Sequence, residues 1–208
     1  MSENPTDLRV VRTKQAIRSA LIALMEEKGF EAICVKDITE RATINRGTFY
    51  SHYEDKFDLM DKCQEQLLKE METKIVPNIP KLIEETKQDD AGPMPISALM
   101  PFFEFLRANQ SFMKALLGPR GDAAFQVKMK ECLHRGLFGQ EHAIFKAEGL
   151  LVPPRYLASY IASAHIGIIQ EWLNGGAIEP PEDIARIISG MTIKGPLFAA
   201  GIRQKPDA

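Results

Sequence analysis

The sequence has little of several features that mark other classes of protein. Its 208 residues contain only three cysteines, Cys34, Cys63 and Cys132, an odd and widely spaced set that does not suit a disulfide framework. The longest uncharged, apolar-leaning run, 156–170, is too short to span a bilayer. Residues 1–7 are polar and lack a signal-peptide pattern. We therefore expect a cytoplasmic protein with no membrane partner.

The sequence also has no excess of positive charge. Its formal net charge is −2, and residues 1–62 hold ten Lys and Arg against eleven Asp and Glu. The charged residues between positions 8 and 20 are nevertheless all basic, namely Arg9, Arg12, Lys14 and Arg18. If the chain binds nucleic acid, it must do so through a few well-placed cations and not through bulk charge.

No arrangement of reactive residues indicates an enzyme. The four histidines are scattered along the chain, and Cys132 and His134, two residues apart on a helix, would face different sides and make a poor metal pair. There is no glycine-rich phosphate loop, His-Glu-x-x-His or Gly-x-Ser-x-Gly motif. We expect no catalytic residue, no metal and no cofactor, and keep a non-regulatory enzyme only as the remaining alternative.

Nearly every segment has helical periodicity, and none has strand-like alternation of useful length. The first helix is marked by apolar residues that recur along one stripe: Ile17, Ala20, Leu21, Leu24 and Met25. Further helical segments are expected at about 35–42, 46–51, from 56 onward, 96–117, 122–147, 154–173 and 181–202. The predicted fold class is all-α with about nine helices, divided into residues 1–60 and residues 61–208.

Residues 35–51 predict a helix-turn-helix, because two short helices are joined by a tight turn and follow a longer helix. Asn45 can cap the short helix at 46–51, and Asp55 can cap the next one. The helix at 46–51 is too short and polar for a core element, since only Phe49, with Tyr53 just beyond it, faces inward. Its polar face suits the major groove of DNA, although a surface helix with incidental polarity fits the periodicity as well.

Four stretches, 35–42, 44–50, 52–53 and 55–59, resemble the signature of the tetracycline-repressor (TetR) family, within a resemblance that covers about residues 9–63. The resemblance implies a DNA-binding transcriptional regulator. It places Arg46, Gly47 and Thr48 at the major groove. The predicted DNA-binding set, which includes residues expected to hold phosphates, is Lys36, Asn45, Arg46, Gly47, Thr48, Tyr50, Ser51, His52 and Lys56. Two positions depart from the family: Cys34 stands where Ser or Thr is usual, and Thr43 where Gly is common.

Residues 102–145 are rich in phenylalanine and methionine, which indicates either ordinary core packing or a ligand cavity between helices. The stretch 102–112 resembles the effector-side domain found in a Gram-positive branch of the family. That resemblance implies a sensor domain without identifying its ligand. The candidate ligand-binding residues are Phe102, Phe105, Phe112, Met113, Phe125, Met129, Tyr160 and Trp172.

The helices at 154–173 and 181–202 are predicted to form an assembly surface. Similar proteins dimerise through a four-helix bundle built from these two helices of each subunit. The candidate dimer-interface residues are Ser159, Ala162, Ser163, Ile166, Gly167, Ile184, Ile187, Ile188 and Met191. The expected function is a homodimeric repressor on a pseudo-palindromic operator, released by a small, largely apolar ligand. The alternative is a DNA-binding regulator controlled by a protein partner with no small-molecule ligand.

Overall fold

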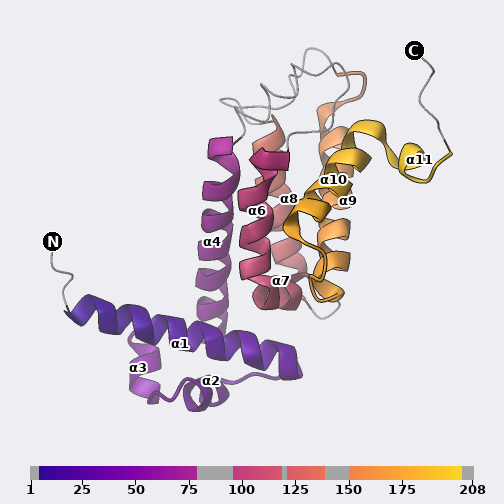
Figure 1. Ribbon diagram of the computed structural model, residues 1–208. Helices are drawn as coiled ribbons and strands as arrows, with labels where there is room; N and C mark the ends of the chain where they lie inside the picture. Colours follow the sequence, from indigo (N-terminus) through magenta and orange to yellow (C-terminus); the bar gives the residue numbers. More distant parts are fainter. Residues whose placement is uncertain (1–4, 79–95, 119–120, 139–149, 203–208) are drawn as a thin grey trace. The chain divides into compact units, whose positions relative to one another are not determined.

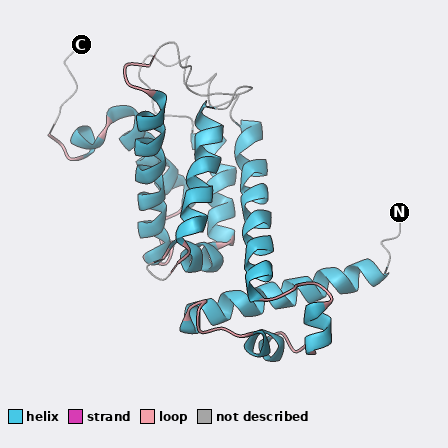
Figure 2. Cartoon of the chain, turned by 180° about the vertical axis from the view of Figure 1, so that it is seen from behind, coloured by secondary structure: helices cyan, strands magenta, loops and turns pink. Residues whose placement is uncertain are grey.

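The structure is a computed structural model that describes residues 5–78, 96–118, 121–138 and 150–202. Within these ranges the backbone forms ten α-helices, one 3-10 turn, η1 (Val76–Asn78), and no strand (Figure 2). This confirms the all-α fold class.

The chain divides into two compact units. The first contains Met1–Leu67 together with Ser111–Asp122, and the second contains Leu68–Gln110 together with Ala123–Ala208. Helix α4 (Lys56–Ile75) continues through the boundary between Leu67 and Leu68. The first unit is therefore larger than residues 1–60, because it also includes residues 61–67 of α4 and residues 111–122 from the middle of the chain.

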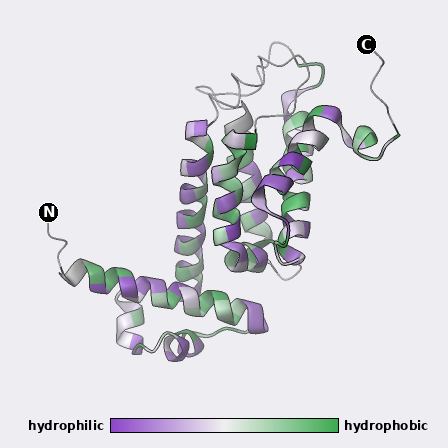
Figure 3. Ribbon diagram, in the orientation of Figure 1, coloured by the Kyte–Doolittle hydropathy of each residue, from purple (hydrophilic) through white to green (hydrophobic). Residues whose placement is uncertain are grey.

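The first unit is built on the long helix α1 (Pro5–Lys28), along which α2 (Val35–Arg41) and α3 (Arg46–Tyr50) lie (Figure 1). Hydrophobic and hydrophilic residues alternate along α1 (Figure 3), and its predicted apolar stripe is buried in full. The helix ends where Gly29 adopts a φ of 77° and donates its backbone N–H to the Met25 carbonyl. A residue without a side chain adopts this conformation without strain, so Gly29 fixes the end of α1.

A segment far along the chain completes the core of the first unit. Helix α7 (Gln110–Leu117) buries Phe112, Met113, Leu116 and Leu117. The guanidinium of Arg18 in α1 lies 5.4 Å from the centre of the Phe112 ring, a cation–π contact that links the two segments. The core of the first unit therefore depends on residues that local periodicity assigns to the other domain.

Two expected helices are each interrupted in the structure. The segment at 96–117 breaks into α6 (Ile96–Ala108) and α7 because Asn109 turns the chain; its backbone N–H and its side-chain amide both donate to the Phe105 carbonyl, at 3.1 and 3.0 Å. The segment at 181–202 breaks into α10 (Pro181–Lys194) and the short α11 (Pro196–Ala199). Gly195 lies between them with a φ of 81°, followed by a proline that has no N–H to continue the first helix.

In the second unit α6 packs on α10, and α8 (Ala123–Phe138) packs on α9 (Pro154–Asn174). The ring of Phe103 meets the edge of Trp172 at a centroid distance of 6.3 Å, and the Trp172 indole N–H donates to the Glu179 carbonyl at 3.1 Å. The expected helix at 122–147 is present as far as Phe138, and residues 139–149 lie outside the described part of the chain.

Candidate nucleic-acid interface

A tight turn joins α2 to α3. Thr43 has a φ of 56°, the left-handed conformation that glycine adopts most easily, and Ile44 then donates its N–H to the Thr39 carbonyl at 3.0 Å. Threonine is a β-branched residue, so its presence here is strained. The turn therefore keeps the geometry of a helix-turn-helix, even though threonine occupies the position where glycine would adopt this φ without strain.

The start of α2 has a capping box formed by Cys34 and Asp37. The Asp37 carboxylate accepts the backbone N–H of Cys34 at 2.8 Å, and the Cys34 thiol lies against the Asp37 N–H, where sulfur is a weak acceptor. Lys28 of α1 pairs with the same carboxylate at 2.8 Å. The hydrogen bond from the Lys28 ammonium, assisted by the Cys34 N–H, holds the pKa of Asp37 well below its usual range. Asp37 thus remains ionised at neutral pH and links the end of α1 to the start of α2.

Helix α3 has the cap and the anchor that its sequence predicts. The Asn45 side-chain oxygen accepts the backbone N–H of Thr48 at 2.7 Å and its hydroxyl at 3.0 Å, which confirms Asn45 as the N-cap. Phe49 is completely buried, and its ring lies 5.6 Å from that of Tyr53, also buried. Burial raises the pKa of Tyr53 to about 12, so this anchor stays neutral. With one apolar anchor inward, the other side chains of α3 are left to face outward.

All nine residues of the predicted DNA-binding set belong to the first unit, and most are open to solvent. Exposed members are Lys36, Asn45, Arg46, Gly47, Tyr50 and Ser51, whereas Thr48, His52 and Lys56 are half-buried. Tyr50 is 55% exposed despite its size. A methyl group on Gly47 would lie 3.3 Å from the side-chain oxygen of Asn45, so the glycine also gives room to the helix cap. The set thus forms a polar surface on α3 and the segments that flank it.

No ion pair engages Arg46 among the described residues, although several other cations of this unit are paired. Four other cations of the unit are paired with carboxylates: Lys28 with Asp37, Lys36 with Glu40, Arg41 with Glu27 and Lys62 with Asp58. Among the described residues Arg46 has no such partner and is exposed. Its fork of donors is therefore available to an external acceptor.

Lys56 uses its ammonium differently from what the resemblance implies. The group donates to the carbonyls of Phe30 and Glu31, at 3.2 and 3.0 Å, and lies 4.8 Å from the centre of the Phe30 ring. It therefore closes the loop after α1 onto the first turn of α4 while half-buried. A phosphate contact from Lys56 stays a prediction, and it would require the ammonium to exchange these carbonyls for a phosphate oxygen.

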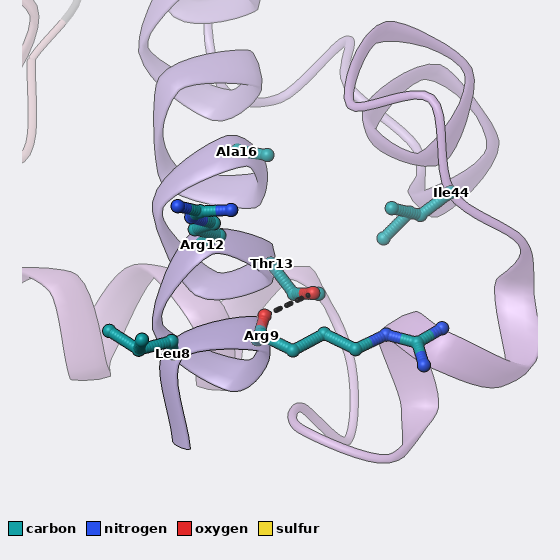
Figure 4. A pocket seen from close by; sticks show the side chains of 6 residues that line it. All are labelled: Leu8, Arg9, Arg12, Thr13, Ala16 and Ile44. Carbon is teal, nitrogen blue, oxygen red and sulfur yellow. Dashed lines mark hydrogen bonds between the residues drawn. The ribbon is translucent and has the colours of Figure 1, made fainter. Parts of the chain in front are cut away.

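A hollow that the sequence did not predict lies beside α3. It is open to solvent, has a volume of about 540 Å³ and is lined by Leu8, Arg9, Arg12, Thr13, Ala16 and Ile44 (Figure 4). The sequence contains a run of four cations in α1. Only the structure shows that Arg9 and Arg12 line this hollow together with Ile44, the residue before the α3 cap.

The candidate ligand-binding residues do not form one set. Phe102, Phe105, Phe125, Met129 and Trp172 are buried within the second unit, whereas Phe112 and Met113 are buried in the first. Tyr160 is 59% exposed, so its side chain lies on the outer face of α9 and not among the interior residues. The expectation that it faces the interior is corrected, since helical phase alone did not show which side of α9 the core covers.

The candidate dimer-interface residues also separate by burial. Ala162, Ile166, Ile184 and Ile188 pack inside their own subunit. Ser159, Ser163, Gly167 and Ile187 are exposed, and Met191 is half-buried. Three of these exposed residues are four apart on α9, which places them on one stripe of small side chains. The surface offered for assembly is consequently narrower than expected, and four of the nine predicted residues serve the core instead.

The described residues contain no group of three or more His, Cys, Asp or Glu side chains that could hold a metal ion. None of the helices in the described ranges is both long and apolar enough to cross a membrane.

The capped, short and polar α3, held against α1 and α2 by a single aromatic anchor, defines a helix-turn-helix DNA-binding protein. Residues 17–63 match the family model described as bacterial regulatory proteins of the tetR family, and residues 95–194 match a transcriptional regulator C-terminal region. The chain belongs to the TetR family of transcriptional regulators.

The relatives agree with this assignment. The uncharacterized HTH-type transcriptional regulator YxbF of Bacillus subtilis is 27% identical over 188 residues, which are 88% of this chain and 45% of the relative. The chain spans less than half the length of the curated relatives it matches. Among solved structures, the dihydroxyacetone kinase operon activator DhaS has a TM-score of 0.57 at 21% identity, covering 88% of this chain and 96% of its own. FadR of Bacillus subtilis in complex with stearoyl-CoA has a TM-score of 0.51 at 14% identity, covering 87% and 98%.

Proposed function

We propose that the protein is a homodimeric, sequence-specific repressor that binds a pseudo-palindromic operator through α3 and acts in the cytoplasm. The observation that carries the proposal is the exposed, unpaired Arg46 on a capped helix whose only deep anchor is Phe49. A planar guanidinium can bond two acceptors of one guanine in the major groove. Asn45 and Thr48 already bond each other, so Arg46 is the side chain best suited to base contacts.

In this proposal the remaining predicted residues position the protein on the duplex. Lys36 and His52 flank α3, while Tyr50 and Ser51 extend its exposed face. Contacts from such groups to phosphates fix register without carrying sequence information. Two subunits related by a two-fold axis would place their recognition helices roughly 34–36 Å apart, one turn of B-DNA. The exposed stripe of Ser159, Ser163 and Gly167 on α9 supports the dimer, because small residues allow a second helix to approach closely.

The proposed effector is a small, largely apolar ligand bound by the second unit. Buried aromatic and sulfur-containing side chains such as Phe102, Phe125 and Met129 supply the chemistry of such a site, and one fold relative was crystallised with stearoyl-CoA. A ligand that favours one arrangement of the subunits shifts the population and thereby alters DNA affinity. The second candidate is a DNA-binding regulator controlled by a protein partner with no small-molecule ligand. One fold relative is described as an operon activator, so activation is kept beside repression as a mode of control.

The first experiment tests the recognition helix. An operator is selected from a random duplex library, and its affinity is compared with that of a random-sequence duplex for the wild type, Arg46→Lys and Arg46→Ala. We expect Arg46→Ala to reduce the difference in binding free energy between the two duplexes by about 1–3 kcal/mol. Arg46→Lys should lose most of the same amount, because lysine keeps the charge but not the planar pair of donors. Lys130→Ala, an exposed change on α8, is the matched control. Discrimination unchanged in both Arg46 variants would overturn this placement of the recognition helix.

The second experiment tests the effector. Stearoyl-CoA and a free long-chain fatty acid are titrated against the protein and against its operator complex. We expect a ligand to raise the melting temperature and weaken operator binding, and the operator to weaken ligand binding by the same factor. If neither lipid nor a wider set of apolar ligands shifts either quantity, the small-ligand proposal fails and control by a protein partner is favoured.

A further inference from the structure

We propose that the hollow formed by α1 and the turn before α3 is a second DNA contact, which binds the sugar–phosphate backbone beside the bases that α3 reads. Its defining residues are Arg9 and Arg12 of α1 and Ile44 of the turn. The inference rests on the proposed function and extends it to a part of α1 that precedes residues 17–63, the part of the chain matched by the family model.

The charges of the first unit are separated in space although they balance in number. No Asp or Glu occurs in residues 8–25 or in residues 41–53. These two acid-free stretches meet at the hollow, since five of its lining residues come from the first stretch and Ile44 comes from the second. A unit with no net cationic excess therefore presents a local positive surface next to α3, which is what an anionic backbone requires.

Arg9 and Arg12 are available for this contact. Both side chains are exposed, and neither has an ion-pair partner in the part of the chain that the structure describes. Most other described cations of the unit, by contrast, are held by carboxylates, carbonyls or rings. Figure 4 shows the Arg9 side chain extending from α1 towards the side on which Ile44 lies. Two guanidiniums without internal partners at one hollow point to an external anion.

The hollow matches a nucleotide backbone in shape and in chemistry. Leu8, Ala16 and Ile44 give it apolar walls, whereas the two arginines and Thr13 supply polar groups. A deoxyribose–phosphate unit has the same division, an apolar sugar next to a charged phosphate. The Thr13 hydroxyl donates to the Arg9 carbonyl at 2.9 Å, so the guanidiniums are the groups left to bind the phosphate.

The position of the hollow relative to α3 selects DNA over a free anion. Ile44 is bonded directly to Asn45, the cap of α3. A duplex that contacts Asn45 and Arg46 therefore comes within reach of the long side chain of Arg9. Since both arginines belong to a folded helix and not to an extended arm, the groove edge and its phosphates are the accessible part of the duplex.

The test uses single charge removals with a control on the same helix. Arg9→Gln and Arg12→Gln each remove one cation from the hollow. Lys14→Gln removes one from the opposite side of α1, because Lys14 is about 140° around the helix from Arg9 and does not line the hollow. Binding of the full-length protein to its selected operator and to a random-sequence duplex is measured over a range of salt concentrations.

We expect Arg9→Gln and Arg12→Gln to weaken binding to both duplexes by similar factors. Each should make the plot of log affinity against log salt shallower by about one unit. The loss of affinity between about 50 and 200 mM salt should therefore be roughly four-fold smaller than in the wild type. Lys14→Gln should leave the slope unchanged. Arg9→Lys, which keeps the charge, should retain the wild-type slope and so separate loss of the contact from loss of folding. Phosphate-ethylation interference should show backbone positions at the flank of each half-site that disappear in Arg9→Gln.

Three outcomes would overturn the inference while leaving the proposed function intact. The first is wild-type affinity and salt dependence in both arginine variants. The second is an equal decrease in affinity from Lys14→Gln. The third is a loss of affinity only for operators with A·T-rich flanks, which would indicate base reading in the minor groove instead. If the wild type selects no operator at all, the proposed function fails first and this inference with it. The two failures are therefore distinguishable.

Discussion

The side-chain amide of Gln64 donates a hydrogen bond of 2.7 Å to a carboxylate oxygen of Asp122, joining positions 58 residues apart in the sequence. Gln64 lies on α4 and is completely buried. Both residues belong to the first unit. The bond ties the segment that follows α7 to the helix that carries the DNA-binding module, so we expect it to contribute to the stability of that module.

Replacing Gln64 with methionine should destabilise the protein. The substitution keeps the length of the side chain but removes a donor from a charged acceptor, and the expected loss is about 1–3 kcal/mol. Urea unfolding monitored by circular dichroism would measure it. Gln15→Met, at an exposed site on α1, is the control. A Gln64→Met protein as stable as this control would show that the bond adds nothing.

Replacing Cys34 with serine should stabilise the protein. Cys34 has the extended backbone of an N-cap, with φ of −118° and ψ of 163°, and a hydroxyl there would accept the Asp37 N–H more strongly than the thiol of the present capping box does. Serine caps are worth about 0.5–2 kcal/mol over alanine, and the expected gain over cysteine is at the low end of that range. Cys34→Ala should show no gain. If alanine and serine raise the melting temperature equally, the cap is not the cause.

Stability should fall as the pH drops from about 6.5 towards 4 because of His165. Burial lowers the pKa of His165 to about 4, whereas the unfolded chain takes up the proton near the ordinary histidine pKa of about 6.5. Between these values the unfolded state binds the proton and the folded state does not, so acid favours unfolding. Above pH 6.5 the contribution of the neutral imidazole is fully present.

Substituting His165 tests whether this residue causes the pH dependence of stability. Its Nε2 lies 2.8 Å from the Thr192 hydroxyl, which itself donates to the Ile188 carbonyl and so accepts from the imidazole. His165→Gln keeps a donor in the side chain but cannot titrate, and it should flatten the dependence of melting temperature on pH in this range. His134→Gln, at an exposed site on α8, should not. Equal slopes in the wild type and His165→Gln would refute the assignment.

A bulky residue on the exposed stripe of α9 should prevent dimerisation. Ser163→Trp places an indole where the proposed partner helix approaches, and the small residues there leave no space for it. Light scattering after size-exclusion chromatography at micromolar concentration should give a monomer mass for this variant and a dimer mass for the wild type. Lys130→Trp, on the exposed face of α8, should remain a dimer. A dimeric Ser163→Trp protein would place the interface elsewhere.

Local chemistry allowed the helix-turn-helix to be predicted in detail. Asn45 is the cap of α3 and Phe49 is its anchor because both roles depend on residues within a few positions of each other. The same holds for Asp55, whose carboxylate accepts the backbone N–H groups of Phe57 and Asp58 at 2.8 and 2.9 Å. Short-range hydrogen bonds of this kind can be predicted from sequence, because donor and acceptor lie within a few residues of each other.

Contacts between distant segments were not predictable in this way. Periodicity does not reveal that Phe112 joins the core of the first unit, or that the Lys56 ammonium turns towards the carbonyls after α1. The outward position of Tyr160 was missed for a related reason. A helix with apolar residues on more than one side has no unique buried face until its neighbours are known.

The unbroken course of α4 through the boundary between the units, and the return of residues 111–122 to the first unit, bear on how such regulators can change during evolution. Joining residues 1–67 to an unrelated sensor would remove Phe112 and Leu116 from the core that supports the recognition helix, and Asp122 from its hydrogen bond with Gln64. Exchange of sensor domains by simple recombination is thus disfavoured. New ligand specificity should arise more readily by substitution within the second unit, whereas operator specificity can change at the exposed residues of α3 without disturbing that core.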